Sequence, residues 1–132
     1  MEVERVRMFG VEVADKPGGL QKVLAKLAAG GIDLCCFYAA SVGKGKGMVY
    51  MGAKDADAFD AFAAESDLKF EETVGFMIEG DDKVGAASAV LKKLADAGIN
   101  GVAGAAKVCD GRYHLGLIVA TDDGDAAEKA LK

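Results

Sequence analysis

A single shift of 67 positions aligns nearly the whole chain with itself and needs no gap. The shift carries Lys16 onto Lys83, and it pairs identical residues throughout: Phe9 with Phe76, Glu12 with Glu79, Asp15 with Asp82, Gly18 with Gly85, Leu27 with Leu94, Gly31 with Gly98, Ile32 with Ile99 and Asp55 with Asp122. A unit of about 60 residues is marginally stable by itself. The repeat therefore predicts two similar units, residues 1–67 and 68–132, that pack on each other.

The hydrophobic periodicity changes in a fixed order within a copy. "RMFGVEV" places Phe9, Val11 and Val13 on one face of a strand. Apolar residues at positions 20, 23, 24 and 27 then form one stripe of a helix over residues 18–29. Two β-rich runs around the turn "GKGKG", a helix over 55–66 and the extended run "LKFEETVGFMIEG" complete the copy. The order strand, helix, strand, strand, helix, strand predicts an α+β unit, with two helices covering a four-stranded antiparallel sheet.

The last strand of the second copy is displaced to the front of the chain in this interpretation. The sequence ends at Lys132, directly after the second helix of that copy. Under the shift, Val3 and Glu4 correspond to Phe70 and Glu71 in the final strand of the first copy. We therefore expect residues 1–6, "MEVERV", to complete the sheet of the second unit and to tie the two units together.

The segment "DKPGGLQKVLAKLAAGGIDL", residues 15–34, contains the first candidate site. Asp15 stands where a carboxylate can cap a helix, and Pro17 suits a first helical turn. Free amide hydrogens at a helix start attract a carboxylate, and glycines let a ligand approach the backbone closely. Asp15 or Asp33 can then receive an ammonium group. The residues alone leave two interpretations open, an amino-acid site and a simple turn.

Both copies resemble ACT domains, small regulatory modules that sense amino acids. The resemblance covers essentially the whole chain and is carried by "DKPGGLQKVLAKLAAGGIDL" and by "DDKVGAASAVLKKLADAGINGV", residues 81–102. It implies a ferredoxin-like fold, pairing of units into a homodimer, and a small effector held between the first loop of one unit and the second strand of its neighbour. The second copy has Val84 in place of Pro17 and Ala86 in place of Gly19.

The resemblance assigns the ligand site by position. On the loop and helix start it points to Asp15, Lys16, Gly18, Gly19 and Leu20, and on the strand side to Ile32, Asp33 and Leu34. The weaker second set comprises Asp82, Lys83, Gly85, Ala86, Ile99, Asn100 and Gly101. An aspartate at position 19 would put a carboxylate at the helix start, where the carboxylate of the ligand is expected to bind, so Gly19→Asp is expected to abolish binding.

The remaining features favour no cofactor, metal or catalytic site. A net charge of −5 disfavours nucleic acid and anionic membranes as partners, and no run reaches the ~20 apolar residues of a membrane span. The three cysteines fit small buried hydrophobes in a reducing, cytoplasmic compartment, and Cys35 and Cys36 should point to opposite faces of a strand. His114 is the only histidine, and "GKGKG" suits a solvated hairpin better than a phosphate loop.

Three classes of function compete for such a chain. The first is a stand-alone allosteric sensor that binds an amino acid and changes its assembly or its contact with a metabolic enzyme. The second is a ligand-free dimerisation module that regulates a separate metabolic enzyme. The third is a ferredoxin-like enzyme of the acylphosphatase kind, but the first loop, "ADKPGGL", lacks the arginine that such a phosphate cradle needs. The sequence therefore favours a regulatory protein without catalytic residues.

Overall fold

The computed structural model describes residues 1–132 and divides into two compact units. The first unit is Met8–Glu72, and the second unit consists of Met1–Arg7 together with Thr73–Lys132. Strand β1 (Glu2–Ala14) supplies residues to both units, because its first residues cluster with Thr73–Lys132 and its remainder clusters with the first unit.

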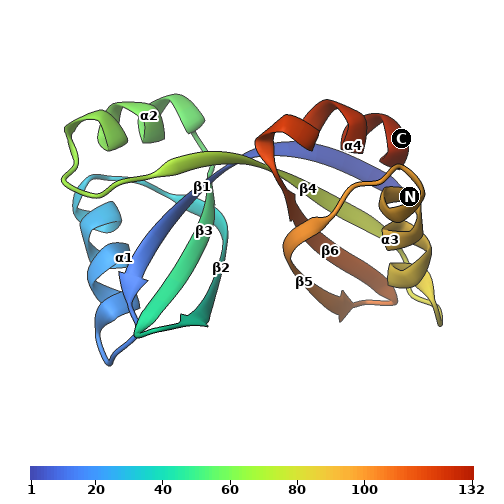
Figure 1. Cartoon of the computed structure of the whole chain (residues 1–132), viewed down its shortest axis with the longest axis horizontal. Helices are drawn as coiled ribbons and strands as arrows, with labels where there is room; N and C mark the ends of the chain where they lie inside the picture. Colours follow the sequence, from blue (N-terminus) through green and yellow to red (C-terminus); the bar gives the residue numbers. More distant parts are fainter. The chain divides into compact units, whose positions relative to one another are not determined.

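The first unit places two helices on one face of an antiparallel sheet (Figure 1). Its strands follow the order β2–β3–β1, and Met51 stands opposite both Phe9 and Phe37 in the register. The elements after β1 are α1 (Gly19–Ala29), β2 (Leu34–Gly43), β3 (Lys46–Ala53) and α2 (Ala56–Glu65).

The core of the first unit follows from the predicted periodicities. Phe9 and Val11 of β1 are buried against Val23 and Leu27 of α1, so the period-two face meets the helical stripe. Phe59 of α2 is fully buried and anchors an aromatic cluster: its ring stacks on Phe9 at 4.0 Å between centroids and meets Phe62 and Phe70 edge-on. Helix α2 begins after Asp55, whose side chain accepts a hydrogen bond from the Ala58 amide at 3.1 Å.

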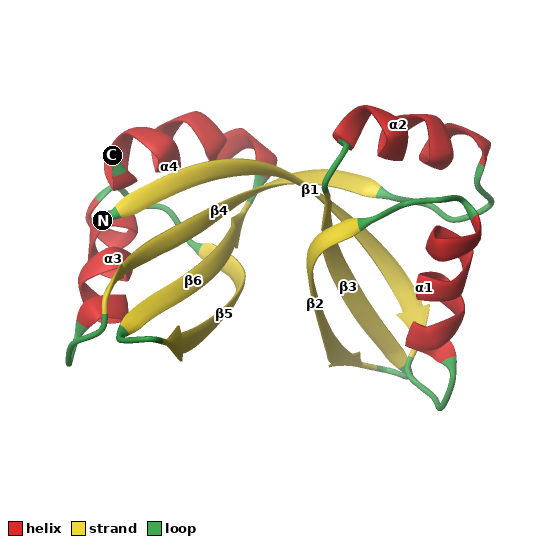
Figure 2. Ribbon diagram, turned by 180° about the vertical axis from the view of Figure 1, so that it is seen from behind, coloured by secondary structure: helices red, strands yellow, loops and turns green.

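The second unit repeats this arrangement with its own core. Its strands follow the order β1–β4–β6–β5, all visible as arrows in Figure 2. The core comprises residues such as Phe76, Ile78, Val90 and Leu94, and Val3 of β1 packs against it. The elements are β4 (Glu71–Asp81), α3 (Ala86–Asp96), β5 (Gly101–Cys109), β6 (Arg112–Val119), a single 3-10 turn (Thr121–Asp123) and α4 (Gly124–Leu131).

The two hairpins are tighter than the sequence suggested. The turn in "GKGKG" is only Lys44–Gly45, with φ of 57° and 71°, and its counterpart Asp110–Gly111 has φ of 51° and 73°. Two consecutive residues with positive φ form a turn whose twist matches the flanking strands. The α+β prediction is confirmed in both units, including the helix predicted at 18–29.

Candidate functional site

The loop between β1 and α1 is fixed by backbone hydrogen bonds at both ends. The amide of Asp15 donates to the Gly45 carbonyl at 3.0 Å, which ties the loop to the β2–β3 hairpin. The amide of Lys16 donates to Ala14, and the amide of Gly19 donates back to Lys16, both at 3.0 Å. The loop is therefore a built turn with a defined shape.

Two adjacent glycines are required by this turn for different reasons. Gly18 precedes the helix with φ of 88°, in the left-handed region that favours glycine. Gly19 is buried, and a Cβ added to it would lie 2.0 Å from the Ala14 carbonyl oxygen. Any side chain at position 19 must therefore push α1 away from the end of β1.

The prediction that Asp15 caps α1 and that Pro17 opens its first turn is wrong. The residue that caps the helix is Gly18, no side chain accepts a hydrogen bond from the helix start, and Pro17 lies in the turn before the cap. The reason is the tight turn itself, which places the capping position three residues beyond Asp15. The first helical hydrogen bond runs from Lys22 to Gly18, so the amides of Leu20 and Gln21 have no intramolecular acceptor.

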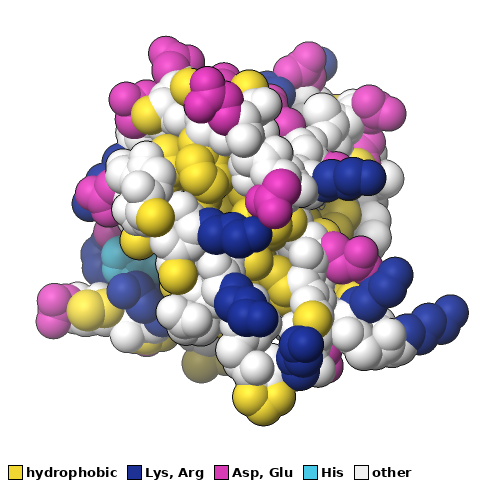
Figure 3. Space-filling view, turned by 90° about the vertical axis from the view of Figure 1, so that its left-hand side faces the viewer, with side chains coloured by type: hydrophobic (Ala, Val, Ile, Leu, Met, Phe, Trp, Pro, Cys, Tyr) yellow, Lys and Arg dark blue, Asp and Glu magenta, His cyan; other side chains and the backbone are white.

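A pocket of about 200 Å³ opens beside the loop within the first unit. Asp15, Lys16 and Leu20 of the predicted set line it, together with Ser41 and Gly47 of the hairpin. A shallower groove of about 450 Å³ continues past Lys16, Gly18 and Leu20 along α1. The structure thus brings together Asp15, Lys16, Gly18 and Leu20 of the predicted site. Figure 3 shows lysine side chains over α1, whereas acidic side chains gather over α2.

The three predicted strand-side residues lie at the other end of α1. Ile32 follows the helix and donates its amide to Leu27, and its side chain packs against the core together with Leu34. The Asp33 carboxylate pairs with the Lys54 ammonium at 2.9 Å. An 11-residue helix spans about 16 Å, so Ile32, Asp33 and Leu34 do not share a pocket with the loop of their own unit.

The second copy forms a similar but distinguishable loop. Gly85 has φ of 84°, and Asp82 donates its amide to Gly111 as Asp15 does to Gly45. Lys83 and Ala86 line a pocket of about 270 Å³. Ile99, Asn100 and Gly101 again lie beyond the far end of the helix, where Ile99 is buried. Because Ala86 carries a Cβ, the close approach made by Gly19 is absent from this copy.

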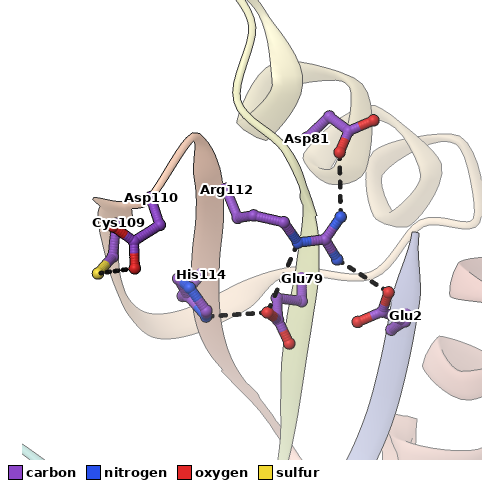
Figure 4. Close-up of polar contacts among 7 residues, drawn as sticks. All are labelled: Glu2, Glu79, Asp81, Cys109, Asp110, Arg112 and His114. Atoms are coloured by element: carbon purple, nitrogen blue, oxygen red, sulfur yellow. Dashed lines mark hydrogen bonds and ion pairs between the residues drawn. The ribbon is translucent and has the colours of Figure 1, made fainter.

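A group of ion pairs in the second unit was not predicted from the sequence (Figure 4). The Arg112 guanidinium contacts the carboxylates of Glu2 at 2.8 Å, Asp81 at 3.0 Å and Glu79 at 3.7 Å. His114 Nδ1 lies 3.7 Å from the same Glu79 oxygen. These residues come from β1, β4 and β6, so the contacts connect three strands of one sheet, a structural role that the repeat alone does not reveal.

Two further features concern metal and membrane sites. No three side chains among the histidines, cysteines, aspartates and glutamates converge to hold a metal ion. None of the helices has the length and apolar character needed to cross a membrane.

The expectation that Cys35 and Cys36 point to opposite faces is wrong. Their Sγ atoms lie 3.8 Å apart, because β2 carries a bulge between Leu34 and Cys36 that breaks the strict alternation of side chains.

No protein-family model matches the chain, and no curated protein matches it in sequence. Solved structures match over almost its whole length. A protein from Bacteroides thetaiotaomicron has a TM-score of 0.74 at 17% identity, with 96% of this chain and 88% of that chain covered. The ligand-free regulatory subunit of aspartate kinase from Thermus thermophilus has a TM-score of 0.62 at 17% identity, with coverages of 98% and 93%.

A larger enzyme shares the fold over part of its length. E. coli aspartokinase III in complex with lysine and aspartate has a TM-score of 0.57 at 14% identity, and the match covers 98% of this chain and 31% of that chain. Regulatory subunits match at nearly full length, whereas the complete kinase matches over a third of its length or less. The chain therefore has the fold of two tandem ACT-type units, the fold of the regulatory subunits of aspartate kinase.

Proposed function

We propose that this protein is a regulatory protein that binds an amino acid at the loop between β1 and α1 of the first unit. One observation carries the proposal: the unpaired amides of Leu20 and Gln21 begin a helix beside a pocket that Asp15, Lys16 and Ser41 line. Unpaired amides at a helix start, together with the helix dipole, favour a bound anion. The negatively charged Asp15 lies in the same pocket and can bind a cationic group of the ligand.

This arrangement matches the two charges of a free amino acid. The α-carboxylate would accept hydrogen bonds from the helix amides and lie near the Lys16 ammonium, while the α-ammonium group would donate to Asp15 and to the Ser41 hydroxyl. Leu20 and Val13 supply apolar walls for a side chain. A volume of about 200 Å³ suits a small ligand better than a nucleotide.

The fold neighbours support this choice of ligand class. One is a regulatory subunit of aspartate kinase, and another is an aspartokinase solved with lysine and aspartate. We infer that the present chain likewise regulates a metabolic enzyme in response to an amino acid.

Exposed apolar side chains on the outer strands supply a surface for assembly. β2 and β5 are the outermost strands of their units, and Phe37 and Val42 of β2 and Val102 and Val108 of β5 are each 45–59% exposed. We propose that a second molecule of the protein covers part of this surface and brings its own strand-side residues, Ile32, Asp33 and Leu34, to the ligand. A ligand that contacts both molecules stabilises the dimer, because it binds the dimer more tightly than the monomer.

The test is a thermal-shift screen of the full chain against the twenty amino acids and a few nucleotides. Ligand at about a hundred times its Kd stabilises the folded state by about 2.7 kcal/mol. Size-exclusion chromatography with and without each hit measures the change in assembly. We expect one amino acid, or a chemically related pair, to raise Tm and to increase the dimer fraction.

The two copies provide a matched pair of variants. Asp15→Asn removes the proposed ammonium partner from the first copy, and Asp82→Asn makes the same change in the second. A charged hydrogen bond is worth about 1.5–3 kcal/mol, so Asp15→Asn should raise Kd by roughly tenfold to a hundredfold. Asp82→Asn should leave Kd unchanged. Equal effects of the two variants would contradict the proposed site.

A screen without any hit would favour the ligand-free alternative. The exposed apolar residues of β2 and β5 would then serve only to pair copies or to bind the regulated enzyme. A constant dimer at all amino-acid concentrations would be the result that supports this alternative.

A further inference from the structure

Strand β2 contains a bulge at its two adjacent cysteines. Leu34 stands opposite Ala53 of β3, and Cys36 stands opposite Gly52, so two steps along β2 match one step along β3. Cys35 and Cys36 therefore share one partner position, which is a glycine. Strict alternation would separate two neighbouring side chains on opposite faces, but a bulge brings them to one region.

A third sulfur reaches the same place from β1. The Cys36 Sγ lies 3.8 Å from the Cys35 Sγ and 4.0 Å from the Met8 Sδ. A Cβ placed on Gly52 would lie 3.1 Å from the Cys35 sulfur, 3.1 Å from the Met8 sulfur and 3.2 Å from the Cys36 sulfur. Three sulfurs from two strands thus surround the open side of one glycine.

These distances suit a metal ion at the centre of the three sulfurs. A metal–thiolate bond is about 2.3 Å long, so three sulfurs in a trigonal plane around one ion stand about 4.0 Å apart. The distances from the Cys36 sulfur to the other two sulfurs, 3.8 and 4.0 Å, are close to that value. We propose that Cys35, Cys36 and Met8 form a binding site for one Cu(I) ion.

The ligand types select the metal. Thiolate and thioether sulfurs favour Cu(I), whereas Zn²⁺ takes thiolate, imidazole and carboxylate ligands and is not ordinarily bound by a thioether. No histidine lies on the strands of the first unit. Cys35 is exposed, Cys36 is half-buried and Met8 is 1% exposed, so an ion enters from the Cys35 side and meets the thioether last.

The Cys36 thiol holds its proton until a metal displaces it. Burial, reinforced by the neighbouring Cys35, raises the pKa of Cys36 to about 11. Each thiol that ligates the ion transfers its proton to solvent as the sulfur–copper bond forms, and copper stays in the Cu(I) state throughout. No oxidant or reductant takes part in the binding step.

The second copy shows that the fold does not need these sulfurs. β5 carries a bulge at the equivalent place, between Gly101 and Ala103. None of the three sulfurs is present in the second copy, where Val102 and Ala103 replace Cys35 and Cys36 and Gly75 replaces Met8. Val119 stands there in place of Gly52. The bulge belongs to both units, whereas the sulfur cluster belongs to the first alone.

The test is an anaerobic titration of the reduced full chain with Cu(I), in competition with a colorimetric Cu(I) chelator. We expect one tightly bound Cu(I) per chain, with X-ray absorption at the copper edge showing three sulfur neighbours. Met8→Leu conserves volume and removes only the thioether, so it should weaken binding at least tenfold and reduce the count to two sulfurs. Cys109→Ser removes a thiol outside the cluster and should change nothing.

Gly52→Ala tests the site without removing a ligand. Its methyl group would occupy the space among the three sulfurs, and flexible side-chain ends can yield by the few tenths of an ångström required. We expect this variant to keep the wild-type circular dichroism spectrum and to bind Cu(I) at least tenfold more weakly. Wild-type affinity in both Met8→Leu and Gly52→Ala, or loss of copper only in Cys109→Ser, would overturn the proposal and leave the sulfurs as packing atoms.

Discussion

Replacing Gly19 with alanine tests whether the close approach of α1 to β1 is real. General rules favour the change, because alanine is a better helix former than glycine by about 1 kcal/mol, chiefly since it lowers the conformational entropy of the unfolded chain. The structure opposes it, because the new Cβ would lie 2.0 Å from the Ala14 carbonyl oxygen. An ordinary contact is longer by more than 1 Å, so backbone must move.

The opposing terms have different sizes. Backbone shifts that accommodate an oversized group typically cost 1–3 kcal/mol and occasionally more, and here the obstacle is a carbonyl at the end of a paired strand and not a flexible side chain. The helix-propensity gain is also reduced, because position 19 is the first residue of α1. We therefore expect a net loss of about 1–2 kcal/mol, or a fall in Tm of roughly 5–15 °C for a unit of this size.

The assay is thermal and urea unfolding followed by circular dichroism. The matched variant is Ala86→Gly in the second copy, where no close approach exists and the loss should be at most about 1 kcal/mol. A Tm for Gly19→Ala equal to or above that of the wild type would refute the reasoning. The same steric argument means that Gly19→Asp disturbs the fold. Loss of binding in that variant would therefore say little about whether the helix start binds the carboxylate of the ligand.

Two further outcomes are expected. We propose that residues 1–6 act as a strand of the second unit, where Val3 packs on the core and Arg5 contacts the carboxylates of Asp125 at 2.7 Å and Glu128 at 3.0 Å. Deletion of residues 1–6 should therefore lower the Tm of thermal unfolding by about 10 °C. An unchanged Tm would contradict this role. Burial raises the pKa of Cys36 to about 11, so the thiolate fraction of Cys36 still rises with pH above pH 9. The rate at which iodoacetamide alkylates Cys36, measured by peptide mass spectrometry, should therefore increase about tenfold between pH 9 and 10. A rate that levels off near pH 9, as for an ordinary thiol, would show that the pKa is not raised.

The sequence predicted elements whose apolar spacing is strong and uninterrupted. The stripe at positions 20, 23, 24 and 27 gave α1 almost to the residue, and the alternation of Phe9, Val11 and Val13 gave the core face of β1. These predictions succeed because burying an apolar face is the dominant favourable term in folding. They use only the spacing of residues along one element, so they do not depend on the details of the turns.

The sequence failed where a single residue changes the local register. Asp15 has the side chain of a helix cap, but the turn moves the capping position to Gly18. Cys35 and Cys36 were assigned to opposite faces by the period-two rule, which a one-residue bulge invalidates. Gly52 in the facing strand was a weak signal for the close approach of the three sulfurs, because a glycine inside a strand often marks a close approach.

The repeat separates what the fold requires from what one copy has added. Gly18 and Gly85 both hold positive φ, and both copies carry the bulge in the strand after the first helix, so these features serve the shared backbone. Gly19 and the three sulfurs occur only in the first copy. A residue found in a single copy is not required by the shared backbone and needs a separate reason. Leu20 and Ser41 of the proposed ligand pocket are of this kind, since the second copy has Ala87 and Val108 in their places, and so are the three sulfurs of the proposed copper site. Both proposed sites therefore lie in Met8–Glu72.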